Sequence, residues 1–111
     1  MNSLSIFRGD DTTINIAVTD SDGVAVDITG FVFWFTAKSD INDLDSDAVI
    51  QKEVTSHSDP AGGLSAVILT NSDTAIDQGN YYYDIQMVDD KDKKSTLVKD
   101  NLKIKQDVTL Q

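Results

Sequence analysis

The chain has 111 residues, of which 40% are hydrophobic and none is cysteine. This length predicts one domain spanning residues 1–111, without disulfides or thiolate metal sites. Residues 1–90 hold 16 acidic and 3 basic residues (−13), and residues 91–111 hold 3 acidic and 6 basic residues (+3), for a net charge of −10. Such a charge argues against partners such as nucleic acid or an anionic membrane and favours a basic partner surface. Aspartates that fill β-turns are the simpler explanation of the same charge.

The sequence contains no predicted membrane span or secretory signal. The longest apolar run, Phe31–Phe35, is far too short to cross a bilayer. The first five residues lack a basic region followed by a long apolar stretch. We therefore expect synthesis in the cytoplasm, whatever the later destination of the protein.

Short segments of alternating polarity, separated by Asp, Gly, Ser and Asn, predict β-strands joined by turns. Residues 13–19 predict a strand with one buried face, and residues 20–23 predict a turn. Residues 24–28 predict a short return strand. Residues 31–36 form the strongest predicted strand, which is aromatic on both faces, so we expect both faces to be covered.

The next part of the chain continues the pattern. Residues 39–47 predict a polar loop with a helical turn that points Ile41 and Leu44 inward. Residues 48–54 predict a weaker strand, residues 56–63 a turn, and residues 64–69 another strand.

The last part begins with a connection over residues 70–78. In it, Asn71-Ser72-Asp73 can cap a short helical turn that Ile76 anchors. Residues 81–88 predict a strand, residues 89–94 a charged hairpin tip, residues 95–98 a return strand, and residues 102–108 a final strand.

This pattern predicts an all-β fold, an immunoglobulin-like antiparallel β-sandwich of seven to nine short strands. Asp77-x-Gly79-x-Tyr81 has the form of the corner before strand F in such sandwiches, where a tyrosine hydroxyl bonds back to the chain. Tyr83 and Trp34 then take core positions. The alternative is that a glycine followed by aromatic residues simply opens a strand.

Residues capable of catalysis are few. His57 is the sole histidine and lies in a polar turn, so we predict a surface residue, no catalytic residues and no enzyme activity. No cofactor is expected. Calcium is the alternative, because Asp43-x-Asp45-x-Asp47 and Asp20-x-Asp22 are rich in oxygen ligands, but solvated turns explain both. Arg8-Gly9-Asp10 is predicted to form a bend, and nothing points to a carboxylate pair in a cleft.

Several segments, in this order and spacing, resemble the N-terminal domain of phage baseplate upper proteins and related tail or tail-fibre accessory proteins. The segments are Arg8-Gly9-Asp10-Asp11-Thr12, Ile14-x-Ile16-x-Val18-Thr19-Asp20-x-x-Gly23, Val26-Asp27-Ile28-Thr29-Gly30, Val32-x-Trp34-Phe35-Thr36-x-Lys38, Asp59-Pro60-x-x-Gly63, Leu69-Thr70-x-x-Asp73-Thr74, Gly79-x-Tyr81-x-Tyr83-Asp84-Ile85-Gln86 and Asp107-Val108-Thr109. The resemblance implies a β-sandwich module without catalytic activity. It also implies attachment of a receptor-binding or fibre component to the virion in a symmetric oligomer. In those proteins a stalk follows the module, a feature that this 111-residue sequence does not include.

The leading hypothesis is a structural virion protein that assembles with other virion proteins and with itself, as a ring or trimer, by strand edges and opposed charge. A capsid decoration protein is a variant of it. The alternative from another class is a carbohydrate-binding or adhesin module, with Tyr82 as a stacking platform because it faces away from Tyr81 and Tyr83.

Overall fold

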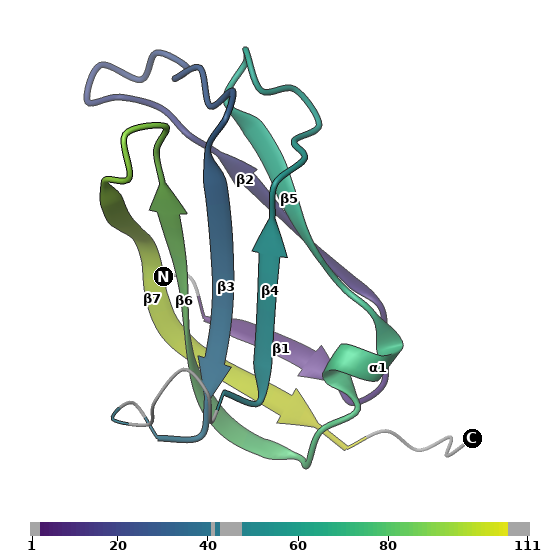
Figure 1. The fold of residues 1–111 in the computed structure, drawn as a ribbon. Coiled ribbons are helices and arrows are strands. Elements are labelled where there is room, and N and C mark those ends of the chain that lie inside the picture. The colour runs from purple at the N-terminus through teal and green to yellow at the C-terminus, as the bar shows by residue number, and fades with distance from the viewer. Residues whose placement is uncertain (1–2, 41, 43–47, 107–111) are drawn as a thin grey trace.

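The computed structural model describes residues 3–40, 42 and 48–106, which form two β-sheets and one helical turn (Figure 1). The all-β prediction is confirmed, and the seven strands of the described residues fall within the predicted number. The larger sheet has the spatial order β1 (Leu4–Phe7), β7 (Lys94–Lys105), β6 (Gly79–Val88), β3 (Val32–Lys38) and β4 (Ile50–Val54). The smaller sheet pairs β2 (Thr12–Ala17) with β5 (Leu64–Leu69), and α1 (Asn71–Thr74) follows β5.

One strand pair differs from the antiparallel arrangement that we predicted. β1 runs parallel to β7, with Leu4 opposite Leu102, whereas the other pairs between named strands of the described residues are antiparallel. The physical reason is that the chain leaves β1 for the smaller sheet, so no hairpin connects β1 to β7. The larger sheet is therefore mixed, and it curls toward the smaller sheet (Figure 1).

Both sheets turn one face toward a shared core. Side chains on a strand point alternately to the two faces, so β3 buries every second residue, Phe33, Phe35 and Ala37. Phe35 stacks on Tyr83 of β6, with ring centroids 5.5 Å apart. Across the core lie apolar residues of the smaller sheet, namely Ile16, Val67 and Leu69. The predicted core role of Tyr83 is confirmed.

The predicted core position of Trp34 is wrong. Trp34 is only half-buried and lies on the outer face of the larger sheet, where it pairs across the strands with Gln86 and Glu53. Phe33 and Phe35, its neighbours in the sequence, take the inward face. Because the side-chain period of a strand is two residues, one aromatic of three consecutive ones must point outward.

Two strand boundaries also differ from the prediction. Residues 24–28 do not form a strand: they make an isolated bridge between Thr19 and Ala25, and Val24 stays 59% exposed. The two predicted C-terminal strands are one strand, β7, because pairing with β6 continues through a β-bulge at Leu97. The predicted inward positions of Ile41 and Leu44 lie outside the described residues.

The predicted tyrosine corner is confirmed. The Tyr81 hydroxyl donates a hydrogen bond of 2.6 Å to the backbone carbonyl of Asp77. Tyr81 is only 8% exposed, so its ring packs in the core while its hydroxyl holds the turn into β6. Gly79 opens that turn with a φ of 151°, a conformation that a residue with a side chain rarely adopts.

Candidate interaction site at an open strand edge

β2 has one paired edge and one free edge. Its paired edge faces β5, and on that side the Val18 N–H donates to the Gly63 carbonyl at 2.9 Å. Backbone groups of successive residues in a strand point alternately to its two edges. The N–H and C=O groups of Thr13, Asn15 and Ala17 therefore point to the other edge, and no named strand of the described residues pairs there.

β7 presents a second free edge opposite the first. β1 covers β7 only from Leu102 to Lys105, so residues 94–101 have no strand on that side in the described structure. The bulge lies in this stretch, since Val98 pairs with Ile85 and Thr96 with Gln86, which leaves Leu97 as the extra residue. Leu97 and Val98 are both half-buried and pack against the core.

A cleft of about 520 Å³ separates these two edges. Six consecutive residues of β2 and the segment after it, residues 14–19, line the cleft. Because side chains of a strand alternate between its two faces, a cleft lined by consecutive residues runs along the edge of the strand. Its apolar lining comes from both sheets. The lining residues are Ser3, Leu4, residues 14–19, Tyr83, Ile85, Leu97 and Val98.

The inner wall of the cleft is apolar at its centre. Burial is the main cause that raises the pKa of the Tyr83 hydroxyl, and the negative charge of Asp100 adds to it. The tyrosine is therefore neutral at ordinary pH. A neutral apolar wall between two rows of backbone hydrogen-bonding groups can hold an extended chain.

Aspartates flank the free β2 edge at both ends. Asp10 and Asp11 precede the strand and Asp20 and Asp22 follow it, all four exposed, while residues 12–19 between them carry no charge. The Asp20 carboxylate accepts hydrogen bonds from the backbone N–H groups of Asp22, at 2.9 Å, and Val24, at 3.1 Å. This carboxylate closes the turn that was predicted over residues 20–23.

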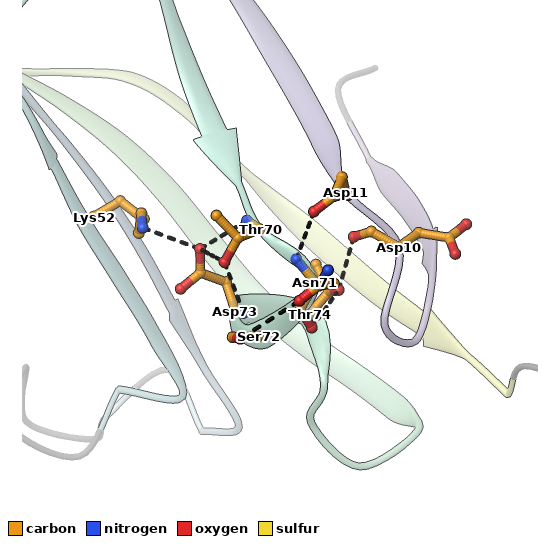
Figure 2. Close-up of polar contacts among 8 residues, drawn as sticks. All are labelled: Asp10, Asp11, Lys52, Thr70, Asn71, Ser72, Asp73 and Thr74. Carbon is orange, nitrogen blue, oxygen red and sulfur yellow. Dashed lines mark hydrogen bonds and ion pairs between the residues drawn. The ribbon is translucent and has the colours of Figure 1, made fainter. Parts of the chain in front are cut away.

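Figure 2 shows how the first acidic pair is held. The Asp11 carboxylate accepts the Asn71 N–H at 2.7 Å, and the Asp10 carbonyl accepts the Thr74 hydroxyl at 2.8 Å. The Asp10 carboxylate points away from these contacts (Figure 2). One end of β2 is thus fixed to α1, with one carboxylate directed outward.

α1 is itself fixed by a capping box. The Thr70 N–H donates to the Asp73 carboxylate at 2.8 Å, and the Asp73 N–H donates to the Thr70 hydroxyl at 3.4 Å. Lys52 of β4 forms an ion pair with Asp73 at 3.0 Å (Figure 2). The cap is therefore Thr70, one residue before the predicted position, and Ile76 packs against the core as predicted.

The Arg8-Gly9-Asp10 tripeptide forms the predicted bend between β1 and β2. Gly9 has a φ of 83°, and the Asp10 N–H donates to the Phe7 carbonyl. The Arg8 guanidinium donates from Nε to the Ile76 carbonyl at 2.9 Å. Arg8 thus holds the loop after α1.

His57 is not the surface residue that we predicted. Its ring is half-buried, with Nδ1 2.8 Å from the Ser65 hydroxyl and Nε2 2.7 Å from the Phe31 carbonyl. Phe33 meets the ring edge to face at 5.2 Å. The carbonyl can only accept, so Nε2 carries a proton and donates it to Phe31, while Nδ1 and the Ser65 hydroxyl share the second hydrogen bond. His57 connects the two sheets, and the Ser65 hydroxyl beside it is buried.

The metal-site alternative has two parts. Among residues 3–40, 42 and 48–106, no three carboxylate or imidazole groups are arranged to hold a metal ion. The Asp20 carboxylate lies in that range and is engaged by backbone N–H groups. The other candidate, Asp43, Asp45 and Asp47, lies outside the described residues.

A second surface lies on the outer face of the larger sheet. Tyr82 is 44% exposed there, as the strand alternation predicts, and half-buried Trp34 shares this face. A small pocket of about 100 Å³ lies beside Tyr82, and its other lining residues are Thr36, Lys38, Tyr83, Asp84, Gln86 and Lys99. This surface combines aromatic rings with polar groups of both charges.

Comparison of the sequence with protein-family models and with curated proteins finds no match. The family resemblance therefore stays a prediction. A search for helices long and apolar enough to span a bilayer finds none in the described residues. The sequence reasoning missed the open β2 edge, although the absence of charge from Thr12 to Thr19 was a signal that could have found it.

Proposed function

We propose that this chain is a structural protein of a bacteriophage particle, without catalytic activity, that joins other virion proteins through its strand edges. The observation that supports this most is the uncharged edge of β2, which no strand of the described residues pairs, beside a cleft whose inner wall includes Ile85, Leu97 and Val98. An exposed edge of this kind is a template for pairing with another chain, and proteins outside assemblies usually protect such edges with charges, proline or bulges. The proposed location in the particle is the tail, the baseplate or a fibre attachment point, and the alternative location is the capsid surface.

The fold proposed for this module is an immunoglobulin-like sandwich. Four strands of the larger sheet, in the order β7-β6-β3-β4, correspond to strands G, F, C and C′ of a variable-type domain, and β2 with β5 corresponds to B with E. The tyrosine corner at Tyr81 supports this assignment. The order and spacing of the segments that resemble phage baseplate upper proteins support the placement in a virion.

The proposed assembly also includes self-association as a ring or trimer. Residues 1–90 carry −13 and residues 91–111 carry +3, so the basic part of one copy complements the acidic body of the next. Light scattering at increasing salt tests this contact. Screening should lower the oligomer mass, whereas a monomer at every salt concentration contradicts self-association.

Mass spectrometry of purified particles tests the main proposal. Particles are induced from the bacterial host that carries the gene, purified on a density gradient, and measured for copy number. The chain should be present at a fixed stoichiometry relative to the tail proteins, while a non-structural phage protein serves as the control that purification should remove. Absence of the chain from particles, or a level equal to that control, contradicts the proposal.

A carbohydrate-binding module is the second candidate, and exposed Tyr82 beside a polar pocket is the observation that favours it. Aromatic faces beside hydrogen-bonding groups suit the binding of sugar rings. A glycan array with wild type, Tyr82→Ala and Tyr82→Phe tests it. Binding that Tyr82→Ala loses and Tyr82→Phe keeps supports this function, and equal or absent binding rejects it.

A further inference from the structure

We propose that the free edge of β2 and the adjoining cleft bind an extended segment of a partner protein, with apolar side chains on its inward face and basic residues at both ends. This inference rests on the proposed function as an assembly protein and names the chemistry of the partner. The segment would add a strand to the smaller sheet, next to β2, and would close the side of the fold that is open between β2 and β7.

The first support is the contrast between β2 and two other strand edges, those of β4 and of the open part of β7. Eight successive residues, Thr12–Thr19, contain no charged side chain and no proline. β4, the edge strand of the larger sheet, carries Lys52 and Glu53, and the open part of β7 carries a bulge together with Lys94 and Lys99. Charges and bulges prevent unwanted pairing, so β2 lacks the protection that β4 and the open part of β7 have. The edge strands β1 and β5 are uncharged as well, and β2 differs from both in the six consecutive residues, 14–19, that line the cleft.

The second support is the shape and lining of the cleft. Side chains of an added strand alternate between the two faces of the sheet, so every second one would enter the cleft over Ile85, Leu97 and Val98. These three residues are apolar and pack against the core. The volume of about 520 Å³ lies within the range of about 300–1,000 Å³ that is usual for binding pockets in proteins. The inward side chains of the partner are therefore apolar.

The third support is charge, which selects the partner. An antiparallel partner along Thr12–Thr19 would span roughly 26 Å, at about 3.3 Å for each residue. Its ends would lie beside Asp10 and Asp11 at one side and Asp20 and Asp22 at the other. Lysine or arginine at both ends complements these carboxylates, whereas acidic residues there are repelled.

The same charges argue against a second copy of this chain as the occupant. Two β2 edges paired about a twofold axis would bring Asp10 and Asp11 of one copy against Asp20 and Asp22 of the other, at both ends. Pairing of β2 with β5 of another copy meets Asp73 and Asp59, which flank β5. The self-association proposed above therefore uses another surface, and a basic segment from a different protein takes this edge.

Fluorescence anisotropy with labelled synthetic peptides tests the inference on the whole chain. The main probe has a core of about eight alternating valine and threonine residues, long enough to pair along Thr12–Thr19, with lysines at both ends. The second probe has the same core with glutamates at both ends. The third keeps the lysines but has proline at alternate core positions, which prevents strand pairing. The first peptide should bind at least about tenfold more tightly than either of the others. A factor of this size corresponds to one like-charge contact in the glutamate-flanked peptide or to one lost hydrogen bond in the proline-containing peptide.

Variants of the β2 edge locate the binding. Asn15 points its N–H to the free edge, so Asn15→Pro removes that donor without touching the β5 side, and proline is tolerated on an edge strand in this orientation. Asn15→Ala keeps the N–H and is the matched control. Asn15→Pro should weaken binding of the lysine-flanked peptide about tenfold or more, while Asn15→Ala should bind as wild type does.

A second variant, in which two aspartates at the ends of β2 become lysines, tests the binding site even if Asn15→Pro does not fold. The side chains of Asp10 and Asp22 are exposed at opposite ends of β2, and neither carboxylate hydrogen-bonds to another described residue, since the hydrogen bonds at both positions use backbone groups. The double variant Asp10→Lys, Asp22→Lys should reverse the preference, so that the glutamate-flanked peptide binds more tightly than the lysine-flanked one. An unchanged preference overturns the inference.

The remaining outcomes are decisive in the same way. Equal binding of the lysine-flanked and proline-containing peptides shows attachment by charge alone and overturns strand addition. Absence of binding by all three peptides also overturns it, yet leaves the proposed function standing if the chain is found in purified particles. Binding of the first peptide by a chain that is absent from particles supports this inference and contradicts the virion role.

Discussion

The Tyr81 hydroxyl lies 2.6 Å from the backbone carbonyl of Asp77, four residues earlier in the chain. This hydrogen bond joins a core ring to the loop that leads from α1 into β6. The turn and the core are therefore stabilised by the same residue, and a change that removes only the hydroxyl separates the two contributions.

Tyr81→Phe should lower the free energy of unfolding by about 1 kcal/mol, because the ring still fills the core while the Asp77 carbonyl loses its donor. Urea denaturation followed by tryptophan fluorescence measures this change. Tyr82→Phe is the matched control, since Tyr82 is 44% exposed and its hydroxyl can bond to water. An equal loss in both variants would show that the corner hydrogen bond contributes nothing.

Stability should fall in alkaline solution. Burial raises the pKa of both Tyr81 and Tyr83 above the ordinary value of 10.0, and the charges of Asp77 and Asp100 add to the effect. A raised pKa means that the unfolded chain loses these protons at a lower pH than the folded chain does. The stability that the two protonated tyrosines contribute is therefore complete below pH 10, and it is lost as pH rises through the folded-state pKa. Denaturation series at about pH 9 and about pH 11 measure it. The variant Tyr81→Phe, Tyr83→Phe should show a smaller decrease, and an unchanged decrease contradicts this cause.

His57→Ala should destabilise the fold by about 1–3 kcal/mol, because the buried Ser65 hydroxyl and the Phe31 carbonyl both lose their partner. Thermal unfolding measured by circular dichroism provides the readout. Ser58→Ala, a change at an exposed position beside it, should leave the midpoint unchanged. If His57→Ala unfolds at the same midpoint temperature as wild type, the contacts of His57 with Ser65 and Phe31 do not stabilise the fold, as expected for a surface residue.

Phe35→Ala should cost about 3–5 kcal/mol, as expected for a fully buried aromatic side chain that leaves a cavity. Trp34→Ala should cost clearly less, because Trp34 lies half-buried on the outer face of the same strand. Guanidinium denaturation followed by circular dichroism compares the two without relying on tryptophan fluorescence. A larger loss for Trp34→Ala would support the core position that the sequence suggested.

Local patterns predicted most of the strands and the corner. Alternating polarity identifies strands because it depends only on neighbours in the chain, and it placed Tyr83 inward and Tyr82 outward correctly. The same reasoning failed for Trp34, where three consecutive aromatic residues obscure the alternation. It also separated β7 into two strands, since a bulge at Leu97 shifts the period within a strand that pairs continuously with β6.

The sequence by itself determined the all-β class, the absence of cysteine chemistry and the tyrosine corner, because composition and short-range spacing carry that information. Only the tertiary structure decided that β1 runs parallel to β7, that His57 connects the two sheets, and that β2 keeps, among the described strands, an open edge beside a cleft. Each of these features depends on which parts of the chain meet in space. Phe31, His57 and Ser65, for example, lie apart in the sequence, and only folding brings them together. An unpaired edge in particular is a property of the whole sheet order, which the pattern of one strand does not contain.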